Sequence, residues 1–421
     1  MPPVIDSRLR ALAEVMVRVG VNLQPGQSLL ITDPYELQGI QPETEPLVAA
    51  IRNVAEGNPT RVIPADPSRL RTLAETDNLH GYEALVSGHL RQLDRHLEEG
   101  GAFLFLQGSQ PQLMAGLPAE RLARLDHAKW RHLGPLIQRL VRGATQWTLA
   151  PAPTSSWAEA AYPEIPAVDR LPALWQSMFA AFRIGPELAA VPSTGRSLPA
   201  NSHPGPDPIS AWHTHLAALA RCRDGLNATR HRRIRYVGPG TDLTLDLPRS
   251  HAWCTAQLVS KAGVPYVANL PTQEVFTAPH KNSANGIARV ARPVVHGGAV
   301  IEGIELEFRR GRVVSASART GQDTLLHLLA TDAGAGRIGE VAMVDEALFR
   351  SSVDVSAVDK SPSGWPNHGR LFRHTLFDEN AGHHIALGAA YPFCSRSLLP
   401  LALNHSQIHL DLPLEAEIEL E

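Results

Sequence analysis

One short segment of the chain pairs two side chains that commonly bind metals. Residues 404–412 read NHSQIHLDL, and a single residue separates His409 from Asp411. Positions i and i+2 of an extended strand project from the same face, so this imidazole and this carboxylate would point at one place. The apolar residues around them would alternate onto the opposite face and enter a core. An H-x-D pattern on a strand is nevertheless weak evidence by itself.

A second segment adds two adjacent histidines and a tyrosine. Residues 376–392 read LFDENAGHHIALGAAYP, with Tyr391 seven residues after His384. If this stretch is helical, the spacing is about two turns, and His384 and Tyr391 would share a face. A buried histidine is more often a hydrogen-bonded core residue than a ligand, and His383 fits that description. Tyr391 also has a simpler interpretation, as a packing residue before Pro392.

Two glutamates stand where apolar stretches begin. Glu274 lies in residues 269–280 (NLPTQEVFTAPH), between a proline turn and an apolar run, and Glu340 opens the apolar end of residues 331–344. A carboxylate in an apolar segment must be solvated, paired or bound to a metal, because burying it bare is costly. Each has an alternative role. Glu274 would be a surface residue that caps a turn, and Glu340 would be the helical i,i+3 partner of Arg337.

Together these segments offer two imidazoles and three carboxylates. The set suits two divalent ions with one bridging carboxylate, and Zn²⁺, Co²⁺ and Mn²⁺ are the ions it favours. No thiolate is among the candidates, so a structural cysteine-type zinc site is not indicated. The sequence also lacks a G-x-S-x-G elbow and a G-K-[ST] phosphate loop. The residues therefore indicate metal chemistry.

The elements that must position these residues differ between the two halves of the chain. In the first half, an amphipathic pattern over residues 5–20 predicts a helix, and SLLIT at residues 28–32 suits a buried strand. The alternation continues with a helix in PLVAAIRNVA and strands in TRVIPAD, AFLFLQG and TQWTLAP. Strands that alternate with helices predict an α/β sheet with covered faces.

The second half has a different pattern. Tryptophan-containing helices are expected at residues 171–183 and 208–226, on either side of a Pro-, Ser- and Gly-rich loop at 189–208. Beyond them, RRIRYVGPGTDLTLDLP and IELEFRRGRVVSASA are two β-hairpin patterns. We predict an α/β protein with two domains. Residues 1–228 form an N-terminal α/β domain, and residues 229–421 form a C-terminal α+β catalytic domain with a mixed sheet.

The composition narrows the class of partner. The 421 residues are 43% hydrophobic and 19% charged, as in soluble globular proteins, with a formal net charge of -3. Nucleic-acid binding is not expected, because no basic excess is present. Membrane association is not expected either, because the longest apolar runs are shorter than a membrane span. Three widely spaced cysteines and the lack of a signal-peptide pattern favour a cytoplasmic protein with reduced thiols.

At these motifs the sequence resembles the thermophilic-type metallo-aminopeptidases, the family of aminopeptidases T and S. Residues 269–279 resemble the family's N-x-P-T-E-E-V-F-T-A-P, and residues 338–344 resemble its L-G-E-x-A-L-V. Residues 376–388 match L-F-D-E-N-A-x-x-H-x-A-L-G, and residues 404–411 match N-x-S-x-x-H-x-D. GPGTDL and the early LQPGQSLLI are further similar features. The resemblance therefore covers nearly the whole chain.

The resemblance implies a role for each candidate residue. Tyr391 would be the catalytic tyrosine. The metal ligands would be Glu274, Glu340, His384, His409 and Asp411. The expected cofactors are two divalent metal ions per subunit (Zn, Co or Mn), the expected substrate is a peptide or aminoacyl compound, and the expected assembly is a homodimer that encloses the active sites.

The expected reaction is removal of the N-terminal residue of a peptide by a metal-activated water. Tyr391 would stabilise the oxyanion, and a carboxylate, either a ligand itself or Glu379, would pass the proton to the leaving amine. Three departures from the family pattern bear on specificity, one of them His280, where the family often has an acidic residue. Gln273 replaces the first of two paired acids, which would remove a charge beside the metals, and residues 351–370 look longer than the usual connection.

A different enzyme class is the alternative. A mononuclear iron ring-cleaving dioxygenase of the dihydroxypyridine type, on the same fold, needs only two histidines, one carboxylate and open coordination positions. The two additional glutamates of this chain favour two metals over one.

Overall fold

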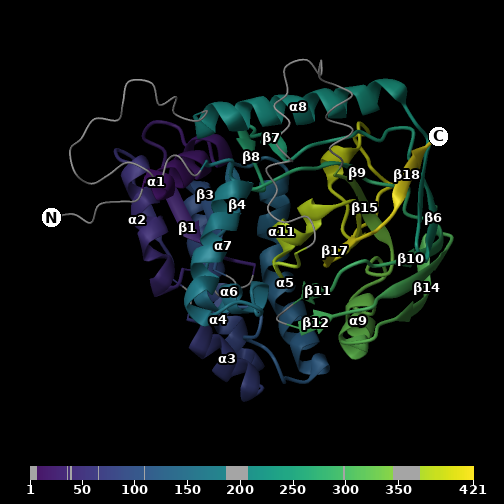
Figure 1. Cartoon of the computed structure of the whole chain (residues 1–421), viewed down its shortest axis with the longest axis horizontal. Helices are drawn as coiled ribbons and strands as arrows, with labels where there is room; N and C mark the ends of the chain where they lie inside the picture. The colour runs from purple at the N-terminus through teal and green to yellow at the C-terminus, as the bar shows by residue number, and fades with distance from the viewer. Residues whose placement is uncertain are drawn as a thin grey trace.

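The computed structural model describes residues 7–35, 37, 40–64, 66–108, 110–185, 207–296, 299–344 and 370–421. The loop expected at 189–208 and the connection at 351–370 lie almost entirely outside the described residues. Figure 1 shows the two halves of the chain side by side, the first at the left and the second at the right.

A four-stranded parallel sheet forms the centre of the first half. Its order is β2-β1-β3-β4. Its strands are β1 (Leu29–Thr32), β2 (Thr60–Val62), β3 (Ala102–Gln107) and β4 (Trp147–Pro151). Every residue of β1 and β3 is buried, as expected for a sheet with both faces covered. The four strands predicted from apolar runs are confirmed.

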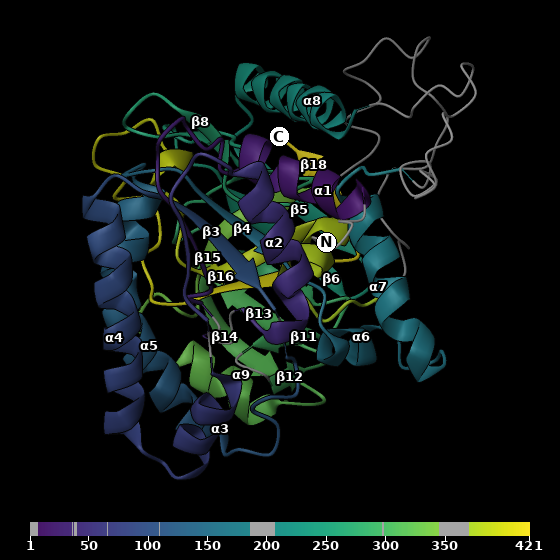
Figure 2. The ribbon, with the colours of Figure 1, turned by 90° about the vertical axis from the view of Figure 1, so that its left-hand side faces the viewer.

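Helices cover both faces of this sheet. They are α1 (Ser7–Glu14) with its π-helical continuation Val15–Gly20, α2 (Glu45–Val54), α3 (Pro67–Glu75), α4 (Leu79–Glu98), α5 (Ala119–Val141), α6 (Ser155–Ala161) and α7 (Ala167–Ala181). Leu29 and Leu104 pack in one cluster with α1 and α2, whereas Leu30 and Phe105 pack in another with α4 and α5. The alternation along each strand thus places α1 and α2 on one face and α4 and α5 on the other, as Figure 2 shows.

Helix α8 (Pro208–Thr229) joins the two halves. The side chain of Asp207 accepts the Ser210 N–H and caps the start of the helix, and Arg230 in a left-handed conformation ends it. In Figure 1 the helix lies along the top of both halves. Neither α8 nor any other helix in the described ranges is long and apolar enough to cross a membrane.

Antiparallel strands make up the second half. The larger sheet has the order β14-β13-β10-β6-β5-β18. Its strands are β5 (Arg233–Gly238), β6 (Thr241–Asp246), β10 (Asn285–Arg289), β13 (Glu305–Arg309), β14 (Arg312–Ser317) and β18 (Glu417–Leu420). Both predicted hairpins are confirmed, as β5–β6 and β13–β14.

A smaller four-stranded sheet, in the order β17-β16-β15-β9, carries the candidate residues. Its strands are β9 (Val275–Thr277), β15 (Ile338–Met343), β16 (His384–Gly388) and β17 (His409–Pro413). The minor elements are β7 (Gln257–Val259), β8 (Pro265–Val267), β11 (Val294–His296), β12 (Ala299–Ile301), α9 (Gln322–Leu329) and α11 (Thr375–Asp378).

The fold class is confirmed, but the expected mixed sheet in the second half is wrong. All paired strands described in that half run antiparallel. Connection length explains part of this. Short turns join β5 to β6 and β13 to β14, and a parallel pair would need a long crossover instead.

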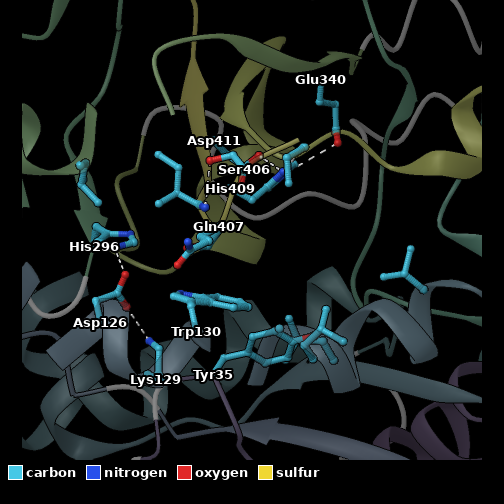
Figure 3. Close-up of a pocket in the computed structure, with 18 of the residues that line it drawn as sticks. Tyr35, Asp126, Lys129, Trp130, His296, Glu340, Ser406, Gln407, His409 and Asp411 are labelled. Atoms are coloured by element: carbon cyan, nitrogen blue, oxygen red, sulfur yellow. Dashed lines mark hydrogen bonds and ion pairs between the residues drawn. The ribbon is translucent and has the colours of Figure 1, made fainter. Parts of the chain in front are cut away.

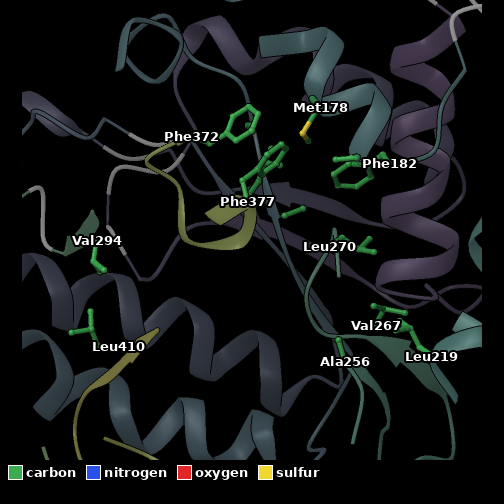
Figure 4. Close-up of a cluster of buried hydrophobic side chains, with 14 of the residues drawn as sticks. Met178, Phe182, Leu219, Ala256, Val267, Leu270, Val294, Phe372, Phe377 and Leu410 are labelled. Carbon is green, nitrogen blue, oxygen red and sulfur yellow. The ribbon is translucent and has the colours of Figure 1, made fainter. Parts of the chain in front are cut away.

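The two halves share one hydrophobic core. Figure 4 shows Met178 and Phe182 of the first half near Phe372 and Phe377 of the second, and all four belong to one cluster of buried side chains. Trp157 also bridges the halves. Its ring meets that of Phe377 edge-on at 5.4 Å, and its indole N–H donates to the Phe372 carbonyl at 2.7 Å. This packing holds the first half against the sheet that carries the site, whereas a domain boundary at residue 228 remains a prediction.

Candidate metal centre

Five side chains of metal-ligand type meet on the β17-β16-β15-β9 sheet. Glu274 immediately precedes β9, Glu340 lies within β15, His384 begins β16, and His409 and Asp411 lie in β17. The backbone register sets β17 against β16, with Asp411 opposite Ala386 and His409 opposite Gly388. Residues more than 130 positions apart in the sequence are thereby brought together, and none of the five is left out.

Glu340 contacts both imidazoles of this group. His384 Nε2 lies 3.2 Å from Glu274 Oε2 and 3.9 Å from Glu340 Oε1. His409 Nε2 lies 3.7 Å from Glu340 Oε2 and 3.3 Å from Asp411 Oδ1. Donor atoms of Glu274, Glu340 and His384 all lie within 4.8 Å of one another. The five side chains therefore form two groups that share Glu340.

The alternative interpretations of the two glutamates are wrong. Glu274 is 5% exposed and Glu340 is 4% exposed, so neither is a surface residue. Glu340 lies on a strand, and the Arg337 guanidinium donates to the Lys281 carbonyl at 2.7 Å and to Asn282 Oδ1 at 2.8 Å. The spacing that suggested a helical ion pair is accidental.

A bulge and a glycine aim Glu340 at the histidines. The register of β15 against β16 shifts between Ile338 and Glu340, and such irregularities often re-aim a side chain next to a site. A Cβ at the intervening Gly339 would come within 2.4 Å of the Gly388 carbonyl oxygen. Only glycine fits there, so the residue before Glu340 is fixed by the backbone approach of β16.

The carboxylates at the centre fit bound cations. Glu274 Oε2 and Glu340 Oε2 are buried and accept no hydrogen bond from the described residues. Burial raises the pKa of Glu340 to about 8, opposed by His409 and assisted by the charges of Glu274 and Asp411. Buried carboxylate oxygens that accept no hydrogen bond are costly, and divalent ions that take oxygen and imidazole ligands would satisfy them.

The backbone orients both imidazoles with Nε2 toward the carboxylates. His409 Nδ1 lies 2.9 Å from the Ala389 carbonyl oxygen, and His384 Nδ1 lies 3.3 Å from that of Gly382. A carbonyl partner holds the proton on Nδ1 and leaves Nε2 as the ligand atom, the usual arrangement around metal-bound histidines. The neighbouring His383 accepts the Val344 N–H with its Nδ1 at 3.1 Å, consistent with a structural role.

Asn380 links two parts of the site, and sequence reasoning missed it. It is 2% exposed. Its Oδ1 accepts the Gln273 N–H at 2.6 Å, and its Nδ2 donates to the Leu376 carbonyl at 2.8 Å and to Glu379 Oε1 at 3.4 Å. Asn380 thus connects the backbone before Glu274 to the turn that carries Glu379. The only signal in the sequence was its place in the D-E-N motif.

Glu379 lies close to the ligand group. It is buried and lines a cavity that the five candidate ligands also line. Burial raises the pKa of its carboxyl well above the ordinary value, and the charges of Asp411, Glu274 and Glu340 act in the same direction. A carboxyl in these surroundings favours its protonated form, as Glu340 also does, so Glu379 differs from Asp411, whose pKa is lowered, despite its burial, by the neighbouring His409.

Tyr391 reaches the site by a route other than the expected helix. Strand β16 is extended, and the chain turns at Gly388, where φ is 99°. The Tyr391 ring stacks on Phe393 at 5.2 Å and lies 5.3 Å from the His409 ring. Burial raises the pKa of the phenol well above its ordinary value, so it remains a hydrogen-bond donor. Tyr391 therefore packs and also faces the cavity.

The side chain of Gln273 contacts Arg183 and does not line the cavity, and its expected effect on the charge beside the metals stays a prediction. Consecutive residues of an extended chain face opposite sides, so Gln273 and Glu274 diverge. The Gln273 Oε1 lies 3.5 Å from an Arg183 nitrogen, and Gln273 does not line the cavity. A glutamate at this position, as in the family pattern, would therefore pair with Arg183. It would not add a charge beside the ligands.

The five clustered side chains form one wall of a cavity of about 570 Å³. We call Glu274, Glu340, His384, His409 and Asp411 the carboxylate wall. Facing it in Figure 3 is a second wall from the first half of the chain. We call Tyr35, Asp126, Lys129 and Trp130 the helical wall, since all but Tyr35 lie on α5. Sequence reasoning missed the helical wall.

The chain is similar to known proteins over most of its length. The family model described as thermophilic metalloprotease (M29) matches residues 5–190 and 197–418. Aminopeptidase T from Thermus thermophilus is 34% identical over 391 residues, which cover 91% of this chain and 85% of that protein. Aminopeptidase 2 from Geobacillus stearothermophilus is 32% identical over 418 residues, covering 96% and 91%.

A solved structure is also similar. Wild-type AmpT from Thermus thermophilus superimposes with a TM-score of 0.79 at 32% identity, covering 98% of this chain and 94% of that one. All of these matches are peptidases, and they lend no support to the dioxygenase alternative.

Proposed function

The chain belongs to the thermophilic metalloprotease family M29, and from this premise we propose that its carboxylate wall holds two divalent ions. The enzyme is a metal-dependent aminopeptidase, a hydrolase that acts on peptides. The proposal concerns which side chains bind the two ions. Glu274 and His384 would bind one ion, His409 and Asp411 would bind the other, and Glu340 would be shared.

The contacts of Glu340 carry this proposal. Its two oxygens lie 3.9 Å from His384 Nε2 and 3.7 Å from His409 Nε2, so one carboxylate spans both ligand groups. One of those oxygens is buried and accepts no hydrogen bond from the described residues. A structural ion pair would explain one such contact, but a shared ligand explains both. Zn²⁺, Co²⁺ and Mn²⁺ are the ions that suit this donor set.

The residues around the ligands have separate roles in hydrolysis. Bound ions supply Lewis-acid polarisation of the peptide carbonyl and a water of lowered pKa. Tyr391 donates its phenol hydrogen to the carbonyl oxygen as negative charge develops there. Glu379 lies beside Asp411 in the same cavity and passes a proton to the leaving amine. Asn380 connects the turn that carries Glu379 to the backbone before Glu274.

Metal removal and replacement test this function. Hydrolysis of a leucyl peptide should stop when a chelator strips the protein, and Zn²⁺, Co²⁺ or Mn²⁺ should restore it. Magnesium, which prefers oxygen ligands and keeps its waters, should restore little and serves as the control. Full peptidase activity in metal-free protein would contradict the proposal. So would a protein that holds iron and consumes oxygen with a phenolic or pyridine substrate.

We also propose a homodimer of two-domain subunits in the cytoplasm. Leu398, Leu399 and Leu401 are 99%, 73% and 75% exposed in a single loop before β17, and an apolar loop of this kind is typical of an interface. The three cysteines, all within the described residues, form no disulfide, which suits a reducing compartment. All five proposed ligands fall within residues 229–421, the predicted catalytic domain. Light scattering of the wild type and of a Leu398→Ser, Leu399→Ser variant tests the dimer.

A further inference from the structure

We propose that the helical wall binds the C-terminal carboxylate of short peptides through Lys129, which would make this enzyme selective for oligopeptides with a free C-terminus. The inference rests on the aminopeptidase function proposed above and adds the class of substrate. It concerns the side of the cavity that faces away from the ligand groups, where no metal ligand lies.

The position of this wall follows from the topology of the parallel sheet. The chain leaves β1 to form β2 on one side and then β3 on the other, so the strand order reverses between β1 and β3. Open parallel sheets bind ligands in the crevice outside the carboxyl ends of their strands at such a reversal. Tyr35 follows β1 and Gln107 ends β3, and both line the cavity. The first half therefore presents its natural binding edge to the candidate metal centre.

The charges on the two sides of the cavity differ. Lys129 Nζ lies 2.9 Å from Asp126 Oδ1, and His296 Nε2 lies 3.6 Å from Asp126 Oδ2. The second distance exceeds that of a hydrogen bond, and His296 Nε2 is buried with no hydrogen-bond partner among the described residues. One carboxylate thus lies between an ammonium and an imidazole, whereas the carboxylate wall has three acids. A zwitterionic peptide complements this difference, with its amine at the acids and its carboxylate at Lys129.

The surface between the two charged regions suits the middle of a short peptide. Figure 3 shows Trp130 and Tyr35 along one side of the cavity, with Lys129 at one end and His409 and Asp411 across from them. The Trp130 and Tyr35 rings lie 6.2 Å apart, and Lys129 Nζ lies 5.6 Å from the Trp130 ring centre. A volume of about 570 Å³ matches pockets that enclose small ligands. A long polypeptide would have to leave the cavity without using Lys129.

A peptide series with matched ends tests the proposal. For metal-loaded enzyme we compare kcat/KM for Leu-Gly, Leu-Gly-Gly and Leu-Gly-Gly-Gly with the value for each C-terminal amide. A charge-assisted hydrogen bond predicts an acid-to-amide ratio of roughly tenfold or more at the length that reaches Lys129. Lys129→Met should bring that ratio to one or below. Lys261→Met, at an exposed turn outside the cavity, should keep the wild-type ratio.

A double variant separates a direct role for Lys129 from an indirect one. Lys129→Met alone leaves Asp126 without its ammonium, and the unpaired negative charge would itself repel a carboxylate. Asp126→Asn combined with Lys129→Met removes both charges and leaves no unpaired buried ion. A ratio near one in the double variant supports direct binding. A ratio that recovers in the double variant, a wild-type ratio near one at every length, or an unchanged ratio in Lys129→Met would overturn the proposal.

Calorimetry keeps the inference testable if hydrolysis fails. Diglycine, the product on the leaving side of Leu-Gly-Gly, should bind wild-type enzyme more tightly than diglycine amide, and Lys129→Met should abolish the difference. Absence of any peptide hydrolysis would refute the aminopeptidase mechanism, while this binding difference would still support Lys129 as a carboxylate site. Equal binding of both ligands to the wild type would overturn it.

Discussion

The two walls of the cavity are built by different means. The carboxylate wall stands on four neighbouring strands, and the backbone register of β15, β16 and β17 fixes the spacing of its side chains. The helical wall comes from one turn after β1 and one face of α5, and its charged side chains Asp126 and Lys129 keep 17% and 14% of their surface exposed. Side chains fixed by sheet register suit catalysis, because catalytic groups tolerate little displacement. Longer side chains on a helix suit binding of the substrate.

The largest effect is expected from Glu340→Ala, which changes the carboxylate wall alone. A shared ligand supports both ions, so the variant should lose metal content together with nearly all turnover. The loss should exceed the 10–100-fold effect that is typical when only an outer partner of a ligand is removed. Elemental analysis and leucyl-peptide hydrolysis measure the two effects. Glu305→Ala, an exposed position on β13, is the control. Normal metal content in Glu340→Ala would refute the shared role.

Tyr391→Phe should remove turnover while leaving the metal in place. The ring would keep its stacking on Phe393, so only the donor to the developing oxyanion is lost. Such losses lower kcat by about 10²–10³, or about 2.7–4 kcal/mol, with little change in KM. Tyr162→Phe, whose hydroxyl bonds Ser177 away from the cavity, is the matched control. A drop in kcat no larger than that of the control would leave Tyr391 as a packing residue.

Asn380→Ala should weaken both the fold and the site. It leaves the buried Gln273 N–H without its acceptor and the Leu376 carbonyl without its donor. An unsatisfied buried group costs about 1–3 kcal/mol, so urea unfolding should shift by that amount. Asn285→Ala, whose side chain bonds only backbone groups at the surface, should shift it less. If kcat falls while stability does not, Asn380 acts on Glu379 and not through the fold.

The smallest effect is expected from Gln273→Glu. Because Gln273 faces Arg183 and not the cavity, the added charge should pair with the guanidinium and leave the choice of N-terminal residue unchanged. A profile of aminoacyl substrates for both proteins tests this. A clear shift toward ordinary α-amino substrates would restore the interpretation drawn from sequence, in which this position sets the charge beside the metals.

The same comparison explains what the sequence could predict. His409 and Asp411 follow the two-residue period of a strand, so their shared face was predictable from local order. The expected helix from His384 to Tyr391 was wrong because the chain is extended through β16 and then turns at Gly388, a positive-φ position that spacing alone does not reveal. Local patterns therefore indicated candidate ligands but not the path of the chain between them.

The helical wall was not predictable from local patterns. Lys129 and Asp126 look like an ordinary i,i+3 pair on a helix surface, and only the packing of the two halves places them opposite the acids. Asn380 is similar, because its role depends on Gln273, which lies 107 positions earlier in the chain. Tyr35 did carry a usable signal, since it follows the first strand of a parallel sheet near the reversal of strand order.

The number of ions per subunit in the wild type and in His409→Ala tests the central claim most directly. About two ions per subunit are expected in the wild type, since paired metals can stabilise both the attacking and the leaving groups of a displacement reaction. His409→Ala should retain one ion, held by Glu274, Glu340 and His384, whose donor atoms lie within 4.8 Å of one another, and should lose peptide hydrolysis. A single ion in the wild type that persists unchanged in His409→Ala, with hydrolysis intact, would contradict the central claim.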